Sequence, residues 1–144
     1  MRDIHPPVTE ATEGTMTMMM SDVRAAYVDN SVATADPARL LVLLCQRLVL
    51  DLRRAVAALE GDDLAEAHRN LVHAQDIVTE LRTSLDPTGF AGGHELAALY
   101  DYVYRRLLQA NLHKDVIAAA ECEVLVRSIA ETWQQAAMAV AGGR

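Results

Sequence analysis

The side chains that could bind a metal ion are few in this chain and poorly spaced for that task. A dinuclear metal site inside a helical bundle uses Glu-x-x-His pairs on inward-facing positions, and no Glu-x-x-His occurs in the sequence. His68 and His73 are five residues apart, which would place them on different sides of a helix. His113 lies near an expected helix end, where it would serve a carbonyl group or the helix dipole. We therefore expect neither a metal site nor a cofactor.

The residues that could act as nucleophiles show no catalytic arrangement either. The sequence contains no Gly-x-Ser-x-Gly turn, no glycine-rich phosphate loop and no recognisable pairing of a cysteine with a histidine. Cys45 and Cys122 lie far apart in apolar surroundings, which is typical of buried, reduced thiols. Four acidic side chains of the C-terminal half are expected to face solvent: Glu95, Asp101, Glu121 and Glu123. The sequence therefore predicts a protein that is not an enzyme.

Three of the four tyrosines lie close together, in the segment 99–115, which reads LYDYVYRRLLQANLHKD. If this segment is helical, Tyr100 and Tyr104 share one face because they are four residues apart. Tyr102 is two residues from each of them and cannot share that face. One of the two surfaces is expected to be the core. The spacing alone leaves open whether the other surface meets a partner protein or a second copy of the chain.

The charge and the hydropathy of the chain exclude two classes of partner. A net charge of -7, with the basic residues scattered, argues against binding to a nucleic-acid backbone. No apolar run approaches the ~20 residues that a membrane-spanning helix needs, and the polar N-terminus lacks the apolar stretch of a secretory signal. We expect a cytoplasmic protein with no nucleic-acid partner and no membrane insertion.

Leucine and alanine recur every three or four residues in four segments, as in helices that each bury one face. Pro37, preceded by an aspartate, would begin the first helix, and Gly61 would end it at the C′ position. Asp62 or Asp63 would cap the second helix. A loop over residues 86–93 precedes the third helix, which is expected from about residue 94 to 111–114. Asp115 would cap the last helix.

These elements predict an all-α fold, an antiparallel up-down four-helix bundle with a short extra N-terminal helix over about residues 22–30. Residues 1–20 are polar and contain a proline pair, which predicts a disordered extension. The bundle domain is expected over residues 21–141, with a frayed tail at 142–144. Several methionines precede residue 21, and one hypothesis is that translation begins at Met20.

Four groups of residues, in order along about 115 residues, resemble the FliS family of flagellar export chaperones. They are Ala26-Tyr27 with Asn30-Ser31-Val32, Asp36-Pro37 and Leu40; Ala74-Gln75-Asp76-Ile77 with Glu80-Leu81; Leu99-Tyr100-Asp101-Tyr102 with Arg105-Arg106-Leu107 and Ala110-Asn111; and Trp133. Arg47 departs from the family pattern, because this position is commonly a small residue. It could reshape one end of a binding groove or place a guanidinium group on its rim. The loop at 87–93 is also longer than in some members.

The resemblance implies a cytoplasmic chaperone that binds flagellin and acts without a cofactor. The C-terminal region of flagellin is disordered in the monomer, and the chaperone would wrap this segment in apolar surface grooves. Wrapping would prevent premature polymerisation, and the chaperone would then deliver flagellin to export-gate components of the flagellar type III apparatus. Recognition would be of the helix-in-groove kind, by a client that folds on binding. Ordering such a client costs about 2–5 kcal/mol or more, so the grooves should be large and apolar.

The resemblance also directs attention to the helices at 40–52 and 94–111 as groove walls. The residues expected to contact the client are Ala26, Tyr27, Leu40, Leu43, Leu44, Val49, Leu99, Tyr102, Arg106 and Asn111. Tyr27 would also dock the N-terminal helix on the bundle, over the client groove in the free state. Two other roles remain open for Leu43, Val49, Leu99 and Tyr102: packing the N-terminal helix, or lying half exposed without a partner. The alternative function is a structural or regulatory bundle without a client, which forms a homodimer through Tyr102 and its neighbours.

Overall fold

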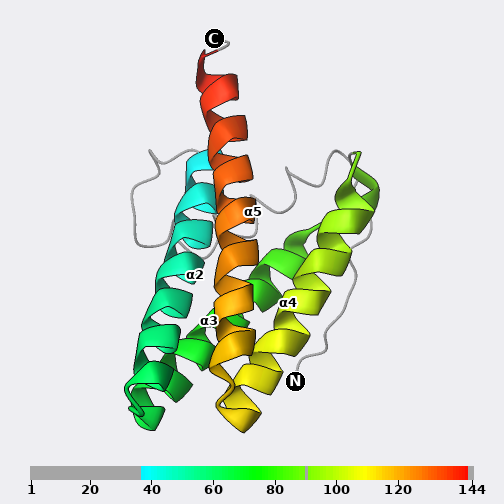
Figure 1. Cartoon of the computed structure of the whole chain (residues 1–144). Helices are drawn as coiled ribbons and strands as arrows, with labels where there is room; N and C mark the ends of the chain where they lie inside the picture. The colour runs from blue at the N-terminus through cyan, green and yellow to red at the C-terminus, as the bar shows by residue number, and fades with distance from the viewer. Residues whose placement is uncertain (1–36, 90, 143–144) are drawn as a thin grey trace.

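The computed structural model describes residues 37–89 and 91–142, and all regular structure in them is helical. Four long helices follow one another, with a single 3-10 turn between the second and third of them (Figure 1). They are α2 (Pro37–Glu60), α3 (Leu64–Ser84), η1 (Pro87–Gly89), α4 (Gly93–His113) and α5 (Val116–Gly142). The all-helical prediction is confirmed. The expected N-terminal helix and the extension at 1–20 lie outside the described residues.

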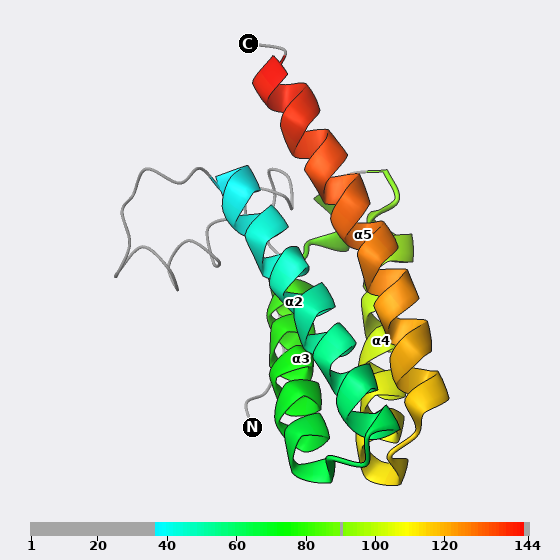
Figure 2. The ribbon, with the colours of Figure 1, turned by 60° about the vertical axis from the view of Figure 1, so that its left-hand side comes forward.

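Each of the four helices packs against two others, so together they enclose one core. α2 contacts α3 and α5, and α4 contacts the same two helices (Figures 1 and 2). The largest side chains that are fully buried in this core are Tyr100, Leu41, Leu48, Leu52, Leu71, Leu81, Leu85 and Leu107. Cys45 and Cys122 are free thiols inside it, and burial raises the pKa of each to about 12. The prediction that both thiols are buried is confirmed.

The α2–α3 turn corrects the expected role of Gly61. Asp62, not the glycine, takes the left-handed conformation, with φ of 57°. The N–H of Asp63 donates to the carbonyl of Ala58 at 2.8 Å, and the N–H of Asp62 to that of Leu59 at 3.2 Å. This pair of bonds is a Schellman motif with Asp62 at C′ and Gly61 one position earlier. The prediction was wrong because a glycine at a helix end usually takes the left-handed position, whereas here an aspartate does.

Aspartates cap the helices that follow the two tight turns. The side chain of Asp63 accepts a hydrogen bond from the N–H of Glu66, which selects it over Asp62 as the cap of α3. Asp115 Oδ1 accepts from the N–H groups of Ile117 and Ala118 at 3.0 and 3.1 Å. Each carboxylate satisfies amide donors that have no partner within the helix. The predicted cap at Asp115 is confirmed.

Arg47, the departure from the family pattern, compensates a buried charge. The Asp51 side chain is only 1% exposed, and its Oδ1 accepts from Arg47 Nε at 3.0 Å. His73 of α3 contacts the other carboxylate oxygen through Nδ1. A buried carboxylate is costly unless it is paired and hydrogen-bonded. Arg47 therefore serves the α2–α3 interface, because the carboxylate that it holds also contacts His73 of α3.

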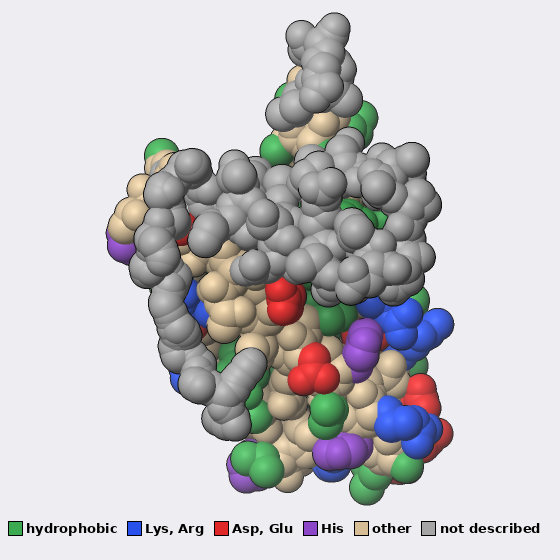
Figure 3. All heavy atoms as spheres, turned by 180° about the vertical axis from the view of Figure 1, so that it is seen from behind, with side chains coloured by type: hydrophobic (Ala, Val, Ile, Leu, Met, Phe, Trp, Pro, Cys, Tyr) green, Lys and Arg blue, Asp and Glu red, His purple; other side chains and the backbone are tan. Residues whose placement is uncertain are grey.

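The described side chains of different kinds are interspersed on the face seen from behind. Figure 3 shows acidic, basic, histidine and apolar groups alternating over the part of this face that is not grey. None of the described helices combines the length and the apolar character that crossing a bilayer requires. An apolar pocket lies elsewhere on the surface, between α4 and α5.

The loop before α4 depends on a glycine at the start of that helix. A Cβ atom built on Gly93 would lie 2.1 Å from the carbonyl oxygen of Pro87, far inside van der Waals contact. η1 therefore packs directly on the backbone of the first α4 residue. A Cβ on Gly61 would lie 3.5 Å from the nearest atom, which is ordinary contact, and Gly61 does not need a positive φ.

We expect Gly93→Ala to lower the free energy of unfolding by about 1–3 kcal/mol, because the added methyl overpacks η1 against α4. Gly61→Ala is the control, and it should be neutral or stabilise by roughly 0.4–1 kcal/mol, because the unfolded chain loses freedom. Urea unfolding of both variants tests this. A larger loss for Gly61→Ala than for Gly93→Ala would contradict the assignment of the two turns.

Candidate functional site

The tyrosine-rich segment forms most of α4, and its tyrosines do serve two surfaces. Tyr100 is 1% exposed and lies in the core, and burial raises the pKa of its phenol above the ordinary value. Tyr104 is half-buried against the same core. Tyr102 is half-buried on another flank of α4, where its hydroxyl reaches α5. The geometric part of the prediction is confirmed, and the second surface is the α4–α5 face.

A polar network joins α4 to α5 at Tyr102. The Tyr102 hydroxyl donates to Glu121 Oε2 and Arg106 Nε donates to Glu121 Oε1, both at 2.7 Å. Arg106 also donates to Gln109 at 3.0 Å, and Gln109 donates to Asp115 at 3.4 Å. The network therefore runs from the middle of α4 to the residue that caps α5.

The shared carboxylate has a shifted pKa. The hydrogen bond from Tyr102, followed by that from Arg106, lowers the pKa of Glu121. The same bond to Glu121 raises the pKa of the Tyr102 phenol. A charge-assisted pair of this kind is shorter and stronger than a neutral hydrogen bond. At neutral pH the network consists of an ionised Glu121 held by a neutral phenol and a guanidinium group.

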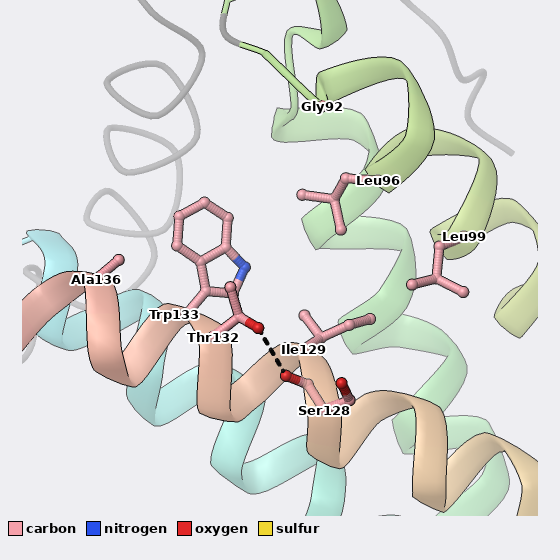
Figure 4. Close-up of a pocket in the computed structure, with 8 residues that line it drawn as sticks. All are labelled: Gly92, Leu96, Leu99, Ser128, Ile129, Thr132, Trp133 and Ala136. Carbon is pink, nitrogen blue, oxygen red and sulfur yellow. Dashed lines mark hydrogen bonds between the residues drawn. The ribbon is translucent and has the colours of Figure 1, made fainter.

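An apolar pocket of about 340 Å³ opens between α4 and α5, beside this network (Figure 4). Leu96 and Leu99 of α4 point across it toward α5, and Gly92 lies at its end. The α5 side chains that line it are Ser128, Ile129, Thr132, Trp133 and Ala136. The Thr132 hydroxyl donates to the Ser128 carbonyl of the same helix at 3.0 Å, so this donor is already satisfied. The pocket can take one or two apolar side chains of a partner.

Of the residues expected to contact a client, Leu99, Tyr102 and Arg106 come together on this α4–α5 face. Asn111 lies on the opposite side of α4, where its Oδ1 is 3.2 Å from His68 Nδ1 of α3 and accepts from Lys114 at 2.8 Å. The structure therefore places Asn111 in the α3–α4 contact.

The expected residues of α2 fall into two groups. Leu40, Leu44 and Val49 are 5%, 6% and 7% exposed and belong to the core. Leu43 is 42% exposed and lies one turn before Arg47, on the flank of α2 that faces α3. These residues are not brought next to Tyr102. Ala26 and Tyr27 lie outside the described residues.

Three of the acidic residues that were expected to face solvent are paired with side chains of other helices. Asp101 accepts from Arg82 of α3 at 2.9 Å. Glu123 pairs with Arg53 of α2 at 3.6 Å, and Glu121 joins the network with α4. The side chains of Asp101 and Glu121 remain 47% and 38% exposed and so still face solvent, whereas that of Glu123 is only 15% exposed. Their partners on other helices lie 15 or more residues away in the sequence. No local spacing marks such a pair. In residues 37–89 and 91–142, His, Cys, Asp and Glu nowhere gather in a group of three or more that could hold a metal ion.

Comparisons with known proteins identify relatives over most of the chain. Residues 19–140 match the family described as flagellar protein FliS. The flagellar secretion chaperone FliS of Bacillus subtilis (strain 168) is 37% identical over 119 residues, which cover 83% of this chain and 89% of that protein. The flagellar secretion chaperone FliS of Salmonella typhimurium is 38% identical over 112 residues, covering 75% and 82%. That of Escherichia coli (strain K12) is 36% identical over 110 residues, covering 75% and 81%.

The lowered pKa of Glu121 predicts an acid-dependent contribution to stability. A carboxyl group whose pKa is lower in the folded state stabilises the fold above its unfolded pKa of about 4.3, and this stabilisation is lost as the pH falls through the folded pKa. We therefore expect wild type to unfold at a higher temperature than Glu121→Gln at pH 7, and the difference to shrink below about pH 4.3. Thermal unfolding at several pH values measures it.

Tyr102→Phe is the companion variant, because it removes one donor and keeps the carboxylate. As the pH falls, Tyr102→Phe should lose less thermal stability than wild type, since the hydrogen bond from Tyr102 is the main cause of the lowered pKa of Glu121. A wild-type advantage over Glu121→Gln that is the same at pH 7 and pH 3 would show that the network does not act through the charge of Glu121.

Proposed function

Because this chain belongs to the FliS family of flagellar proteins, we propose that it is a secretion chaperone whose client is flagellin. The observation that carries the proposal is the family match over residues 19–140, together with relatives that are named flagellar secretion chaperones. The chaperone would act in the cytoplasm. It would hold the C-terminal segment of flagellin, prevent premature polymerisation, and hand the client to the export gate of the flagellar type III apparatus.

The α4–α5 face supports helix-in-groove recognition of such a client. It presents a pocket lined by apolar side chains next to half-buried Tyr102. One aliphatic side chain of a client helix would fill the pocket between Leu99 and Trp133. Burying a side chain of that size contributes roughly 1.5–3 kcal/mol. This is comparable to the cost of about 2–5 kcal/mol or more for ordering the client, so further contacts elsewhere are required.

A client that wraps around the bundle can reach faces that are far apart on it. Leu43 would provide a contact on α2, and Asn111 one beside α3. The buried residues Leu40, Leu44 and Val49 would shape the α2 surface from beneath. Ala26 and Tyr27 remain proposed as the residues that dock an N-terminal helix, which the client would displace.

We propose the antiparallel up-down arrangement, with the extra N-terminal helix, as the architecture that presents these faces. The connections support it: α2 and α3 are joined through residues 61–63, and α4 and α5 through residues 114 and 115. Helices that pack side by side across such short turns must run in opposite directions. The relatives named as secretion chaperones favour this client-binding role over a client-free dimerising bundle.

The first test is binding to flagellin of the same organism. We expect a complex with full-length flagellin, and a loss of affinity of roughly 100-fold or more when the C-terminal segment of about 50 residues is deleted, because most of the groove contacts would go with it. Isothermal titration calorimetry measures both affinities. Binding that survives the deletion unchanged would show that the C-terminal segment is not what the chaperone holds.

The second test separates the pocket from the rest of α4. Leu99→Ala should weaken flagellin binding by about 10-fold, the loss expected for an interface anchor. Leu108→Ala is the matched control, because Leu108 is 37% exposed on the same helix and does not line the pocket. Trp133 is the single tryptophan of the chain, so its emission should shift when a tryptophan-free client peptide fills the pocket. If Leu99→Ala and Leu108→Ala weaken flagellin binding equally and the Trp133 emission does not shift, the client does not bind in this pocket.

A further inference from the structure

The polar network between α4 and α5 ends where the pocket begins. Leu99, which lines the pocket, and Tyr102, which donates to Glu121, are three residues apart on the same flank of α4. On α5, Glu121 and the pocket residue Ser128 are seven residues apart, two turns on the same flank. The Tyr102–Glu121 bond therefore crosses between the helices at the edge of the pocket.

Glu121 holds α4 at two points. Its two carboxylate oxygens accept from Tyr102 and Arg106, which are one turn apart on α4. Arg106 continues the network through Gln109 to Asp115, the cap of α5. One side of the α4–α5 contact, from Tyr102 to the turn, is thus tied by hydrogen bonds with Glu121 at their centre.

The pocket side of the same contact is mostly apolar, although the Trp133 side chain of α5 lies close enough to the buried Tyr100 phenol of α4 to influence its pKa. Within the part of the chain that the structure describes, no side-chain hydrogen bond joins α4 to α5 between Gly92 and Leu99. The surfaces that face each other there are apolar, as Figure 4 shows for Leu96, Leu99 and Ile129. Apolar surface exposed to water in an open pocket is unfavourable, so the helices would gain by closing over it unless something fixes their separation.

We propose that Glu121 is a positioning residue for client binding, which keeps the pocket open by holding Tyr102 and Arg106 against α5. The proposal rests on the proposed function for its client, but its geometry does not. The carboxylate acts as a strut: it fixes the α4–α5 separation at the pocket's edge, so that the client meets a preformed cavity. Without it, Tyr102 and Arg106 are released together and α4 can settle onto Ile129 and Trp133.

The experiment compares Glu121→Ala with Glu123→Ala, a matched control two residues away on α5. Glu123 is also a paired carboxylate, but its partners are Arg53 of α2 and Arg127. Affinity for the C-terminal segment of flagellin, acrylamide quenching of Trp133 and the thermal midpoint are measured for each. We expect Glu121→Ala to weaken binding by about 10-fold and to lower the quenching constant of Trp133 by roughly two-fold as the pocket closes. Glu123→Ala should change neither.

A double-mutant cycle separates positioning from a general loss of stability. In a Tyr102→Phe/Arg106→Gln background, Glu121→Ala should cause no further loss of affinity, because its partners are already gone. If Glu121→Ala lowers the affinity by the same factor in this background as in wild type, the proposal is overturned. It is also overturned if both the Glu121 and the Glu123 variants lose affinity in proportion to their loss of thermal stability. A third outcome would overturn the proposal but leave the proposed function standing: wild type binds flagellin, and Glu121→Ala shows the same affinity and the same Trp133 quenching as wild type.

If wild type fails to bind flagellin, the proposed function fails, and the quenching of Trp133 still tests the strut. Lower quenching in Glu121→Ala than in Glu123→Ala then supports it, and equal quenching in the two variants refutes it.

Discussion

The structure depends on α5 packing against two neighbours at once, α2 on one flank and α4 on the other. Its apolar stripe fills the core, and its charged residues are divided between the flanks. Glu123 pairs with Arg53 of α2, whereas Glu121, two residues earlier, is held by Tyr102 and Arg106 of α4. Two residues turn a helix by more than half of its circumference. Glu121 and Glu123 therefore reach helices on opposite sides of α5, namely α4 and α2. This division sets the separation of α4 and α5, and with it the pocket.

The two interfaces that involve buried or half-buried carboxylates are built differently. Asp51 is almost fully buried; the Arg47 guanidinium of its own helix compensates its charge, and the His73 ring of α3 contacts its other carboxylate oxygen. Such a pair costs desolvation and mainly specifies how α2 and α3 fit together. Glu121 remains 38% exposed in its side chain, so its bonds are weaker individually and more easily exchanged. The α2–α3 contact is therefore the more firmly specified of the two, and the α4–α5 contact is the better suited to receive a partner.

The helices, and the residues at which they begin, are well predicted from the sequence, because helix formation and capping depend on residues within one turn of each other. The cap at Asp115 and the buried face through Tyr100 follow from spacing and side-chain chemistry alone. For the cap of α3 the sequence left Asp62 and Asp63 open, and the hydrogen bond to Glu66 selects Asp63. The end of α2 was harder, since either Gly61 or Asp62 can take the left-handed position, and only the backbone hydrogen bonds distinguish them.

The amino-acid sequence by itself determined the helical class, the two surfaces of the tyrosine-rich segment and the family resemblance, because each is written in residues close together or in a fixed order. Only the tertiary structure decided what Tyr102 meets, which of the α2 leucines are covered, and where a pocket lies. Tyr102 and Glu121 are 19 residues apart and on different helices, so no periodicity links them. Leu43 and Leu44 are neighbours of the same type, and only packing leaves the first exposed and buries the second.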